Sequence, residues 1–288
     1  MSKRVVVCGD DFGMNADIDE GMIALAGMRR VSAVSCLTLG PTFAANAPRL
    51  AAQDVDIGLH LNLSETLGPG AEPMPALRAL ILKAYAGLLD AAWVDAQIAR
   101  QFDAFEAAFG RAPDYVDGHR HVHQLPGIRQ RVLALLAQRY GTQAGVHAPW
   151  LRQTAPGMQC GIPLKESVKA RVIGALGAAA LAREARSSGL RTNRRLLGVY
   201  AFDGGKRRYA HLLQTWLFNA REGDLVMCHP ALGSKQGSAM DRQRHAEFEV
   251  LADPKLGDWL CTNGVSITRL ALTQTAPVLP VLARAIPA

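Results

Sequence analysis

Arg4-Val5-Val6-Val7-Cys8-Gly9-Asp10-Asp11-Phe12-Gly13 is the stretch that decides the fold of this 288-residue chain. A continuous β-branched run is typical of a strand that is buried on both faces, as in a parallel sheet. The run passes into glycines and two aspartates, which are typical of the loop that follows such a strand. The stretch therefore predicts a parallel α/β sheet whose first loop carries two carboxylates.

Strand-like and helix-like segments alternate along the rest of the chain. The expected strands cover residues 4–8, 31–39, 55–61, 113–116, 144–147, 194–199, 224–228 and, more weakly, 265–268. The expected helices cover residues 15–28, 42–52, 77–109, 126–140, 164–187, 209–220 and 242–252. This alternation predicts a single-domain α/β protein, a (β/α) TIM-like barrel, complete or incomplete, with about seven parallel strands. A doubly wound open sheet is the alternative, although no GxGxxG follows the first strand. We expect a catalytic domain over residues 1–272 and a tail over 273–288.

The net charge indicates which binding partners this chain can attract, and the cysteines indicate the redox state of its cellular compartment. The net charge is +7, and much of the basic excess lies in residues 183–195 and 206–208. Because no aromatic residues are interleaved there, a solvated basic face is favoured over a nucleic-acid site. Five scattered cysteines without a CxxC pair indicate a reducing, cytoplasmic environment. No membrane span is expected, since the most apolar long stretch, residues 172–182, is too short.

Polar side chains stand at the end of nearly every expected strand. In chain order they are Asp10, Asp11, His60, Asp117, His119, His147, Asp203 and His229. In a parallel barrel the carboxyl ends of all strands meet at one rim, where active sites are built. Any one of these residues, taken alone, could have the purely structural role of capping a helix or loop. Their shared position predicts a site assembled from distant segments.

The segment Asp117-Gly118-His119-Arg120-His121-Val122-His123 has the composition of a metal site. Imidazole is the commonest metal ligand, and one aspartate with two histidines leaves positions open for water and substrate. Such ligands fit Zn²⁺, Fe²⁺, Co²⁺ or Ni²⁺ better than Mg²⁺, which prefers oxygen. The GxSxG, P-loop and HExxH motifs of other chemistries are absent from the sequence.

Four motifs resemble the YdjC-like (ChbG/HpnK) carbohydrate deacetylases, in that family's order and over about residues 4–270. They are Gly9-Asp10-Asp11-Phe12-Gly13, Gly58-Leu59-His60-Leu61-Asn62-Leu63, the 117–123 segment, and Met227-Cys228-His229-Pro230-Ala231. The resemblance implies a distorted TIM-like barrel, often homodimeric, that removes acetyl groups from N-acetylated sugars with one divalent metal ion, zinc or magnesium.

Carried over by position, the resemblance also implies roles for individual residues. Asp11, His60 and His119 correspond to the metal ligands, Asp10 to the general base and His229 to the general acid. Asp117, His121 and His123 are expected to orient His119, to pack, or to face the substrate, and Asp203 belongs to the same supporting group. His147 stands where the family pattern has an arginine at the end of the strand before the second loop.

Other functions remain open at this stage. One is another metal-dependent sugar-processing barrel enzyme, an isomerase or a phosphoesterase. Another is a catalytically silent sugar-binding protein, against which the presence of Asp10, Asp11 and His229 together argues. A third is a nucleic-acid-associated protein, which would bind with steep salt dependence. The loops over residues 62–76 and 148–163 are expected to determine which sugar binds.

Overall fold

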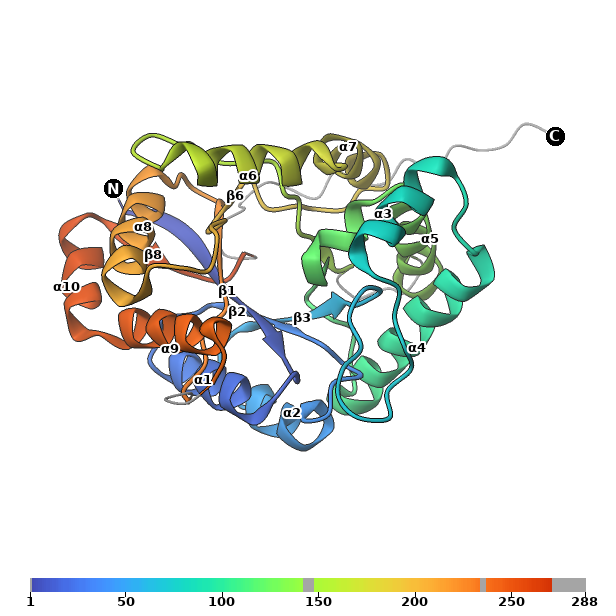
Figure 1. Ribbon diagram of the computed structural model, residues 1–288, viewed down its shortest axis with the longest axis horizontal. Coiled ribbons are helices and arrows are strands. Elements are labelled where there is room, and N and C mark those ends of the chain that lie inside the picture. Colours follow the sequence, from blue (N-terminus) through green and yellow to red (C-terminus); the bar gives the residue numbers. More distant parts are fainter. Residues whose placement is uncertain (1, 142–147, 234–236, 271–288) are drawn as a thin grey trace.

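The computed structural model of this protein shows a parallel sheet surrounded by helices (Figure 1). It describes residues 2–141, 148–233 and 237–270. The strands are β1 Lys3–Phe12, β2 Ala33–Cys36, β3 Asp56–Leu61, β4 Tyr115–Gly118, β5 Trp150–Leu151, β6 Leu196–Leu197, β7 Leu225–Cys228 and β8 Val265–Ile267. The helices are α1 Ala16–Gly27, α2 Phe43–Ala51, α3 Leu77–Ala86, α4 Ala91–Phe109, the 3₁₀ helix η1 His119–Gln124, α5 Ile128–Tyr140, α6 Leu164–Ala175, α7 Ala178–Ser187, α8 Gly205–Asn219, α9 Ala239–Ala252 and α10 Pro254–Thr262.

The sheet is curled into a distorted barrel, as the sequence predicted. Its strand order is β5-β4-β3-β2-β1-β7-β6, and the paired strands run parallel. β8 pairs with the beginning of β1. Isolated bridges join Leu151 to Thr192 and Pro156 to Leu196, and they link the two edges of the sheet where a regular ladder is missing. The carboxyl ends of the strands therefore meet around one opening.

β1 is an interior strand of the sheet, between β2 and β7, and its side chains from Val5 to Cys8 are apolar on both faces. Val5 and Val7 pack in the large core between the sheet and the helices. Val6 and Cys8 belong to a second cluster composed largely of strand residues, including Tyr115, on the inner face of the curled sheet. The two-residue period of a strand assigns alternate residues to these two cores.

The observed elements differ from the predicted ones at two glycines and one short strand, and α10 was not predicted. The helix expected over residues 164–187 is broken at Gly177, where φ is +139° and a Cβ would lie 2.3 Å from the Gln124 carbonyl oxygen. The helix expected over residues 77–109 is two helices, because α3 ends at Gly87 in the left-handed conformation. The loop predicted over residues 148–163 contains β5, whose two-residue length gave no periodic signal.

The strand expected over residues 144–147 and the tail over 273–288 lie outside the described residues. Cys8, Cys36 and Cys228 are buried in the core, as predicted, and all five cysteines are free. In the described part of the chain, no helix combines the length and the apolar character needed to cross a bilayer.

Candidate active site

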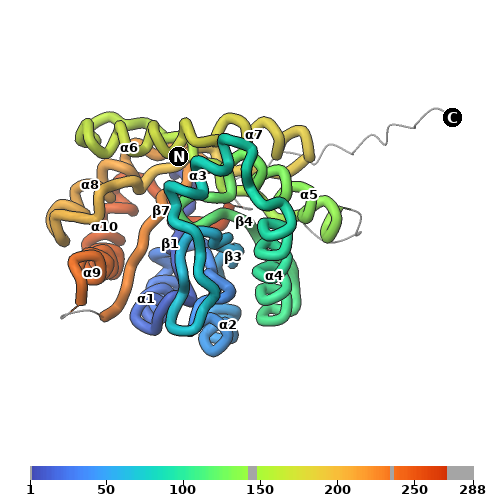
Figure 2. Tube along the Cα trace, turned by 45° about the vertical axis from the view of Figure 1, so that its right-hand side comes forward, coloured from blue at the N-terminus to red at the C-terminus, as the bar shows by residue number. Residues whose placement is uncertain are grey.

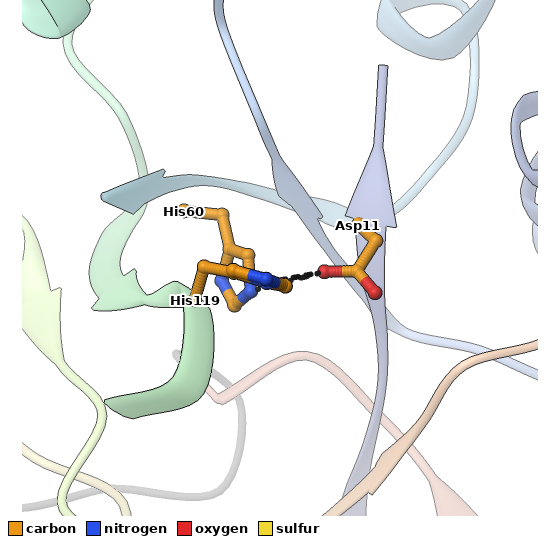
Figure 3. Close-up of side chains that lie close together, drawn as sticks. All are labelled: Asp11, His60 and His119. Carbon is orange, nitrogen blue, oxygen red and sulfur yellow. Dashed lines mark hydrogen bonds and ion pairs between the residues drawn. The ribbon is translucent and has the colours of Figure 1, made fainter. Parts of the chain in front are cut away.

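Asp11, His60 and His119 form the centre of the candidate site at the carboxyl ends of the strands (Figure 3). Each offers one ligand atom, and these atoms lie within 4.8 Å of one another. His119 Nδ1 is 2.9 Å, and His60 Nε2 is 3.4 Å, from Asp11 Oδ1. All three residues are buried. One carboxylate and two imidazoles at this spacing are a donor set that suits a divalent metal ion.

An irregularity in β1 brings both adjacent aspartates to the site. Gly9 is paired with Val34 and Phe12 with Cys36, so three steps along β1 match two steps along β2. Asp11 has φ +79°, in the left-handed region that aspartate tolerates better than most residues. In a regular strand, neighbouring side chains point to opposite faces. The bulge allows both carboxylates to take part in one constellation.

The Arg244 guanidinium and His119 keep the Asp11 carboxylate ionised. Arg244 Nη2 donates to Asp11 Oδ2 at 2.5 Å, which leaves Oδ1 for the histidines. Burial alone would raise the pKa of Asp11, but Arg244 and His119 hold it well below the ordinary value. An ionised carboxylate is the form that binds a metal.

His60 is oriented by Asp117, for which we had expected a role in orienting His119, in packing or in facing the substrate. His60 Nδ1 is 2.6 Å from Asp117 Oδ1, so its Nε2 faces Asp11. Ser35 donates to the other oxygen of Asp117 at 2.8 Å. Burial opposes protonation of the imidazole, but Asp117 and Asp11 raise the pKa of His60 to about 10. The surroundings of His60 therefore stabilise positive charge, which is also what a metal ion supplies.

Asp10 lies against Arg152, a residue that the sequence analysis did not identify. Arg152 follows β5, is fully buried, and donates to both oxygens of Asp10 at 2.6 Å. It also lies 2.7 Å from Asp117 Oδ2. Burial raises the pKa of Asp10, but the Arg152 guanidinium outweighs it and the net shift is downward. Asp10 is thus an ionised carboxylate beside the candidate metal ligands.

Arg152 stands in the second loop, directly after β5. The resemblance led us to look for an arginine at position 147, where the chain has His147, a residue outside the described part. The strand next to β4 is instead β5, and Arg152 comes directly after it. The apolar pair Trp150-Leu151 ahead of an arginine was the available sequence signal, but it is too short to distinguish from a loop.

His229 comes directly after β7, the strand paired with β1. Its Nε2 is 3.9 Å from Asp10 Oδ2, and its ring meets Phe202 edge-on at 4.7 Å between centroids. Its backbone N–H donates to buried Glu247 at 2.6 Å. Among the described residues, its Nδ1 has no hydrogen-bond partner. Burial lowers the pKa of His229 to about 4.

The remaining predicted residues take different positions. His123 is buried and its Nε2 is 2.7 Å from the Arg152 carbonyl oxygen, so it supports the backbone that carries Arg152. His121 lies in a left-handed turn with Arg120, at φ +62° and +53°. Asp203 belongs to a surface group of ion pairs with Lys165 and Arg208. Its neighbour Phe202, rather than Asp203, contacts His229.

One protein family, two named relatives and a solved structure resemble this chain over about half of its length or more. Residues 4–262 match the family described as YdjC-like protein. A human (Homo sapiens) protein named carbohydrate deacetylase is 29% identical over 93% of this chain and 90% of its own length. A chitooligosaccharide deacetylase from Yersinia pestis (strain Pestoides F) is 32% identical over 48% of this chain and 58% of its own. The solved structure of a candidate cellobiose-phosphate cleavage protein from Enterococcus faecalis V583 has the same fold, with a TM-score of 0.65 and 20% identity over 95% of this chain and all of that one.

Proposed function

Because the chain belongs to the YdjC-like family, we propose that it is a metal-dependent carbohydrate deacetylase. It hydrolyses the acetamide of an N-acetylated sugar to an amine and acetate. The observation that carries the proposal is the convergence of buried Asp10, Asp11, His60 and His119 with partly buried His229 at the carboxyl ends of the strands. The name of the human relative, carbohydrate deacetylase, supports the same reaction class.

Asp11, His60 and His119 are the proposed ligands of one divalent ion. The residues fit such an ion because their donor atoms converge and because Asp117 fixes which nitrogen of His60 faces inward. Two imidazole donors favour zinc over magnesium, which prefers oxygen ligands. A bound ion there supplies Lewis-acid polarisation of the acetamide carbonyl and a lowered pKa of its water.

Asp10 is the proposed general base. Its carboxylate is held by two hydrogen bonds from Arg152, so its position is fixed and it is ionised before a substrate arrives. It takes a proton from the water that adds to the acetamide carbon. General bases positioned in this way contribute typically 10²–10⁴-fold to a rate.

His229 is the proposed general acid for the departing nitrogen. An amine leaves poorly as an anion, so the nitrogen must gain a proton while the C–N bond breaks. His229 Nε2 lies 3.9 Å from Asp10 Oδ2, which places the proton taken by Asp10 one transfer away from the imidazole. Cleavage then gives the neutral amine and acetic acid, which loses its proton to solvent and becomes acetate, and Asp10 is ionised again.

The finer assignments are also proposals. An oligosaccharide of N-acetylglucosamine is the first substrate class to test, because one relative is named chitooligosaccharide deacetylase, and a glycolipid headgroup is the second. Five free cysteines support a cytoplasmic enzyme. The homodimer implied by the family resemblance can be checked by light scattering during size-exclusion chromatography.

Acetate release from N-acetylglucosamine, diacetylchitobiose and longer oligomers is the test. The protein is first treated with a chelator and then given Zn²⁺, Mg²⁺ or Co²⁺ separately. We expect no acetate from the chelated protein and recovery with one ion, zinc first. An isomerised sugar or released phosphate instead of acetate and amine would reassign the reaction to another metal-dependent barrel chemistry. Sugar binding without any product would indicate a silent binding protein.

A further inference from the structure

We propose that Glu65 is a positioning residue that orients His119 and strengthens metal binding at the site. Glu65 lies at the beginning of the segment between β3 and α3, which is cyan in Figure 2. The inference rests on the proposed function in one respect only, that Asp11, His60 and His119 bind a divalent ion.

The two histidines have equivalent surroundings, and this equivalence is the main evidence. Each has one ring nitrogen close to Asp11 Oδ1, namely His60 Nε2 at 3.4 Å and His119 Nδ1 at 2.9 Å. The second ring nitrogen of each meets a carboxylate. His60 Nδ1 is 2.6 Å from Asp117 Oδ1, and His119 Nε2 is 2.8 Å from Glu65 Oε2. Metal-binding histidines generally donate their other N–H to such a group, which fixes the tautomer and raises the basicity of the ligand.

Glu65 is held at this place by a turn built around Asn62. The side-chain oxygen of Asn62 accepts from the backbone N–H groups of Ser64 and Glu65, both at 3.1 Å. Its amide donates to the Glu65 carbonyl oxygen at 2.7 Å. Gln101 of α4 in turn accepts from Asn62 N and donates to Asn62 O, each at 2.8 Å. Since Asn62 and Gln101 are buried, the backbone that presents Glu65 is fixed by both β3 and α4.

An arginine accompanies each of the two carboxylates. Asp117 lies 2.7 Å from Arg152, and Glu65 is ion-paired with Arg120, the residue next to His119. The two positions differ in exposure, because Asp117 is fully buried whereas the Glu65 side chain keeps 32% of its surface exposed. The support for His60 is therefore part of the core, and the support for His119 comes from a loop.

The test measures metal affinity without substrate. Zn²⁺ binding to the chelator-stripped protein is followed by competition with a chelating dye for wild type, Glu65→Ala and Glu65→Gln. We expect Glu65→Ala to bind about 10–100-fold more weakly. Glu65→Gln should fall in between, because its amide oxygen can still accept from His119 Nε2. The absorption bands of bound Co²⁺ should change in the same order.

Glu72→Gln is the matched control. Glu72 lies in the same loop but bonds to Gln97 at 3.0 Å and to Arg100 at 3.1 Å. The Zn²⁺ affinity of the Glu72→Gln protein should stay within about twofold of that of wild type. Equal weakening by Glu65→Ala and Glu72→Gln would overturn the inference, because general loosening of the loop would then explain both.

The result separates this inference from the proposed function. If Glu65→Ala binds Zn²⁺ as tightly as wild type while wild type releases acetate, the role of Glu65 is wrong and the function stands. If Glu65→Ala weakens binding but wild type releases no acetate from any sugar, the role of Glu65 stands and the function fails. A wild-type protein that binds no divalent ion overturns both.

Discussion

Replacing Arg152 by methionine tests whether one buried cation holds the carboxylates of the site together. Arg152 is fully buried and makes hydrogen bonds of 2.6 Å to both oxygens of Asp10 and an ion pair of 2.7 Å with Asp117. Methionine keeps a similar length but leaves both carboxylates buried without their shared partner. Removing one partner of a buried ion pair costs about 3–5 kcal/mol. For a chain of this length, such a loss corresponds to a midpoint about 6–10 °C lower.

Urea unfolding in the presence of a chelator measures the free energy of unfolding of the chain alone. Arg49→Met is the control, because Arg49 also makes two hydrogen bonds to a carboxylate, that of Glu20, but at the exposed surface. It should change stability far less.

Combining Arg152→Met with Asp10→Asn gives the sharper test. We expect Asp10→Asn to destabilise the wild-type protein, because Arg152 then loses a charged partner. In the Arg152→Met background the same substitution should stabilise the protein, since it removes an uncompensated buried charge. If Arg152→Met costs no more than Arg49→Met, or if Asp10→Asn has the same sign in both backgrounds, the reasoning is refuted.

Three further substitutions test separate parts of the site. Asp10→Asn should keep metal binding in calorimetry but lower acetate release roughly 10²–10⁴-fold, and unchanged release would exclude Asp10 as the base. Burial raises the pKa of Glu247 from 4.5 to about 7, so its charge destabilises the folded state as pH rises through that interval. Glu247→Gln should therefore gain stability relative to wild type between pH 5 and about 8, and a constant difference across this range would contradict the assignment. Asp203→Asn should leave kcat/KM for the N-acetylated sugar unchanged, because Asp203 pairs with Lys165 and Arg208 at the surface; a large loss would place it in the site.

The architecture was predictable where the chain carries long, uniform signals. The β-branched run of β1 and the alternation of strands and helices predicted the parallel barrel correctly. β5 was missed because two residues give no periodicity, and its partner β4 and the bridge to Thr192 define it only in three dimensions. The break at Gly177 depends on close approach to the Gln124 carbonyl, which belongs to another element.

The site was predictable only as far as residue types identify chemistry. Three histidines and two adjacent aspartates are rare enough to be noticed, and the structure brings Asp11, His60 and His119 together. The groups that orient and neutralise them were missed. Arg152, Arg244 and Glu65 are ordinary charged residues in sequence, and only the fold brings them within hydrogen-bond distance of the site. Asp117 was noticed as a supporting residue, but the histidine that it contacts is His60, because β3 and β4 place it opposite that residue.

The irregular pairing of β1 makes this strand intolerant of insertions and deletions. Three steps from Gly9 to Phe12 match two steps on β2, so one extra residue is what allows Asp10 and Asp11 to act on the same side. Deleting a single residue there would restore a regular ladder and turn one of the two carboxylates toward the helices. Loops elsewhere on the rim can change length while the reaction stays the same, and they are the natural places to graft new specificity. Between residues 9 and 12, by contrast, both the number of residues and the identity of the two aspartates are needed to place the two carboxylates in the site.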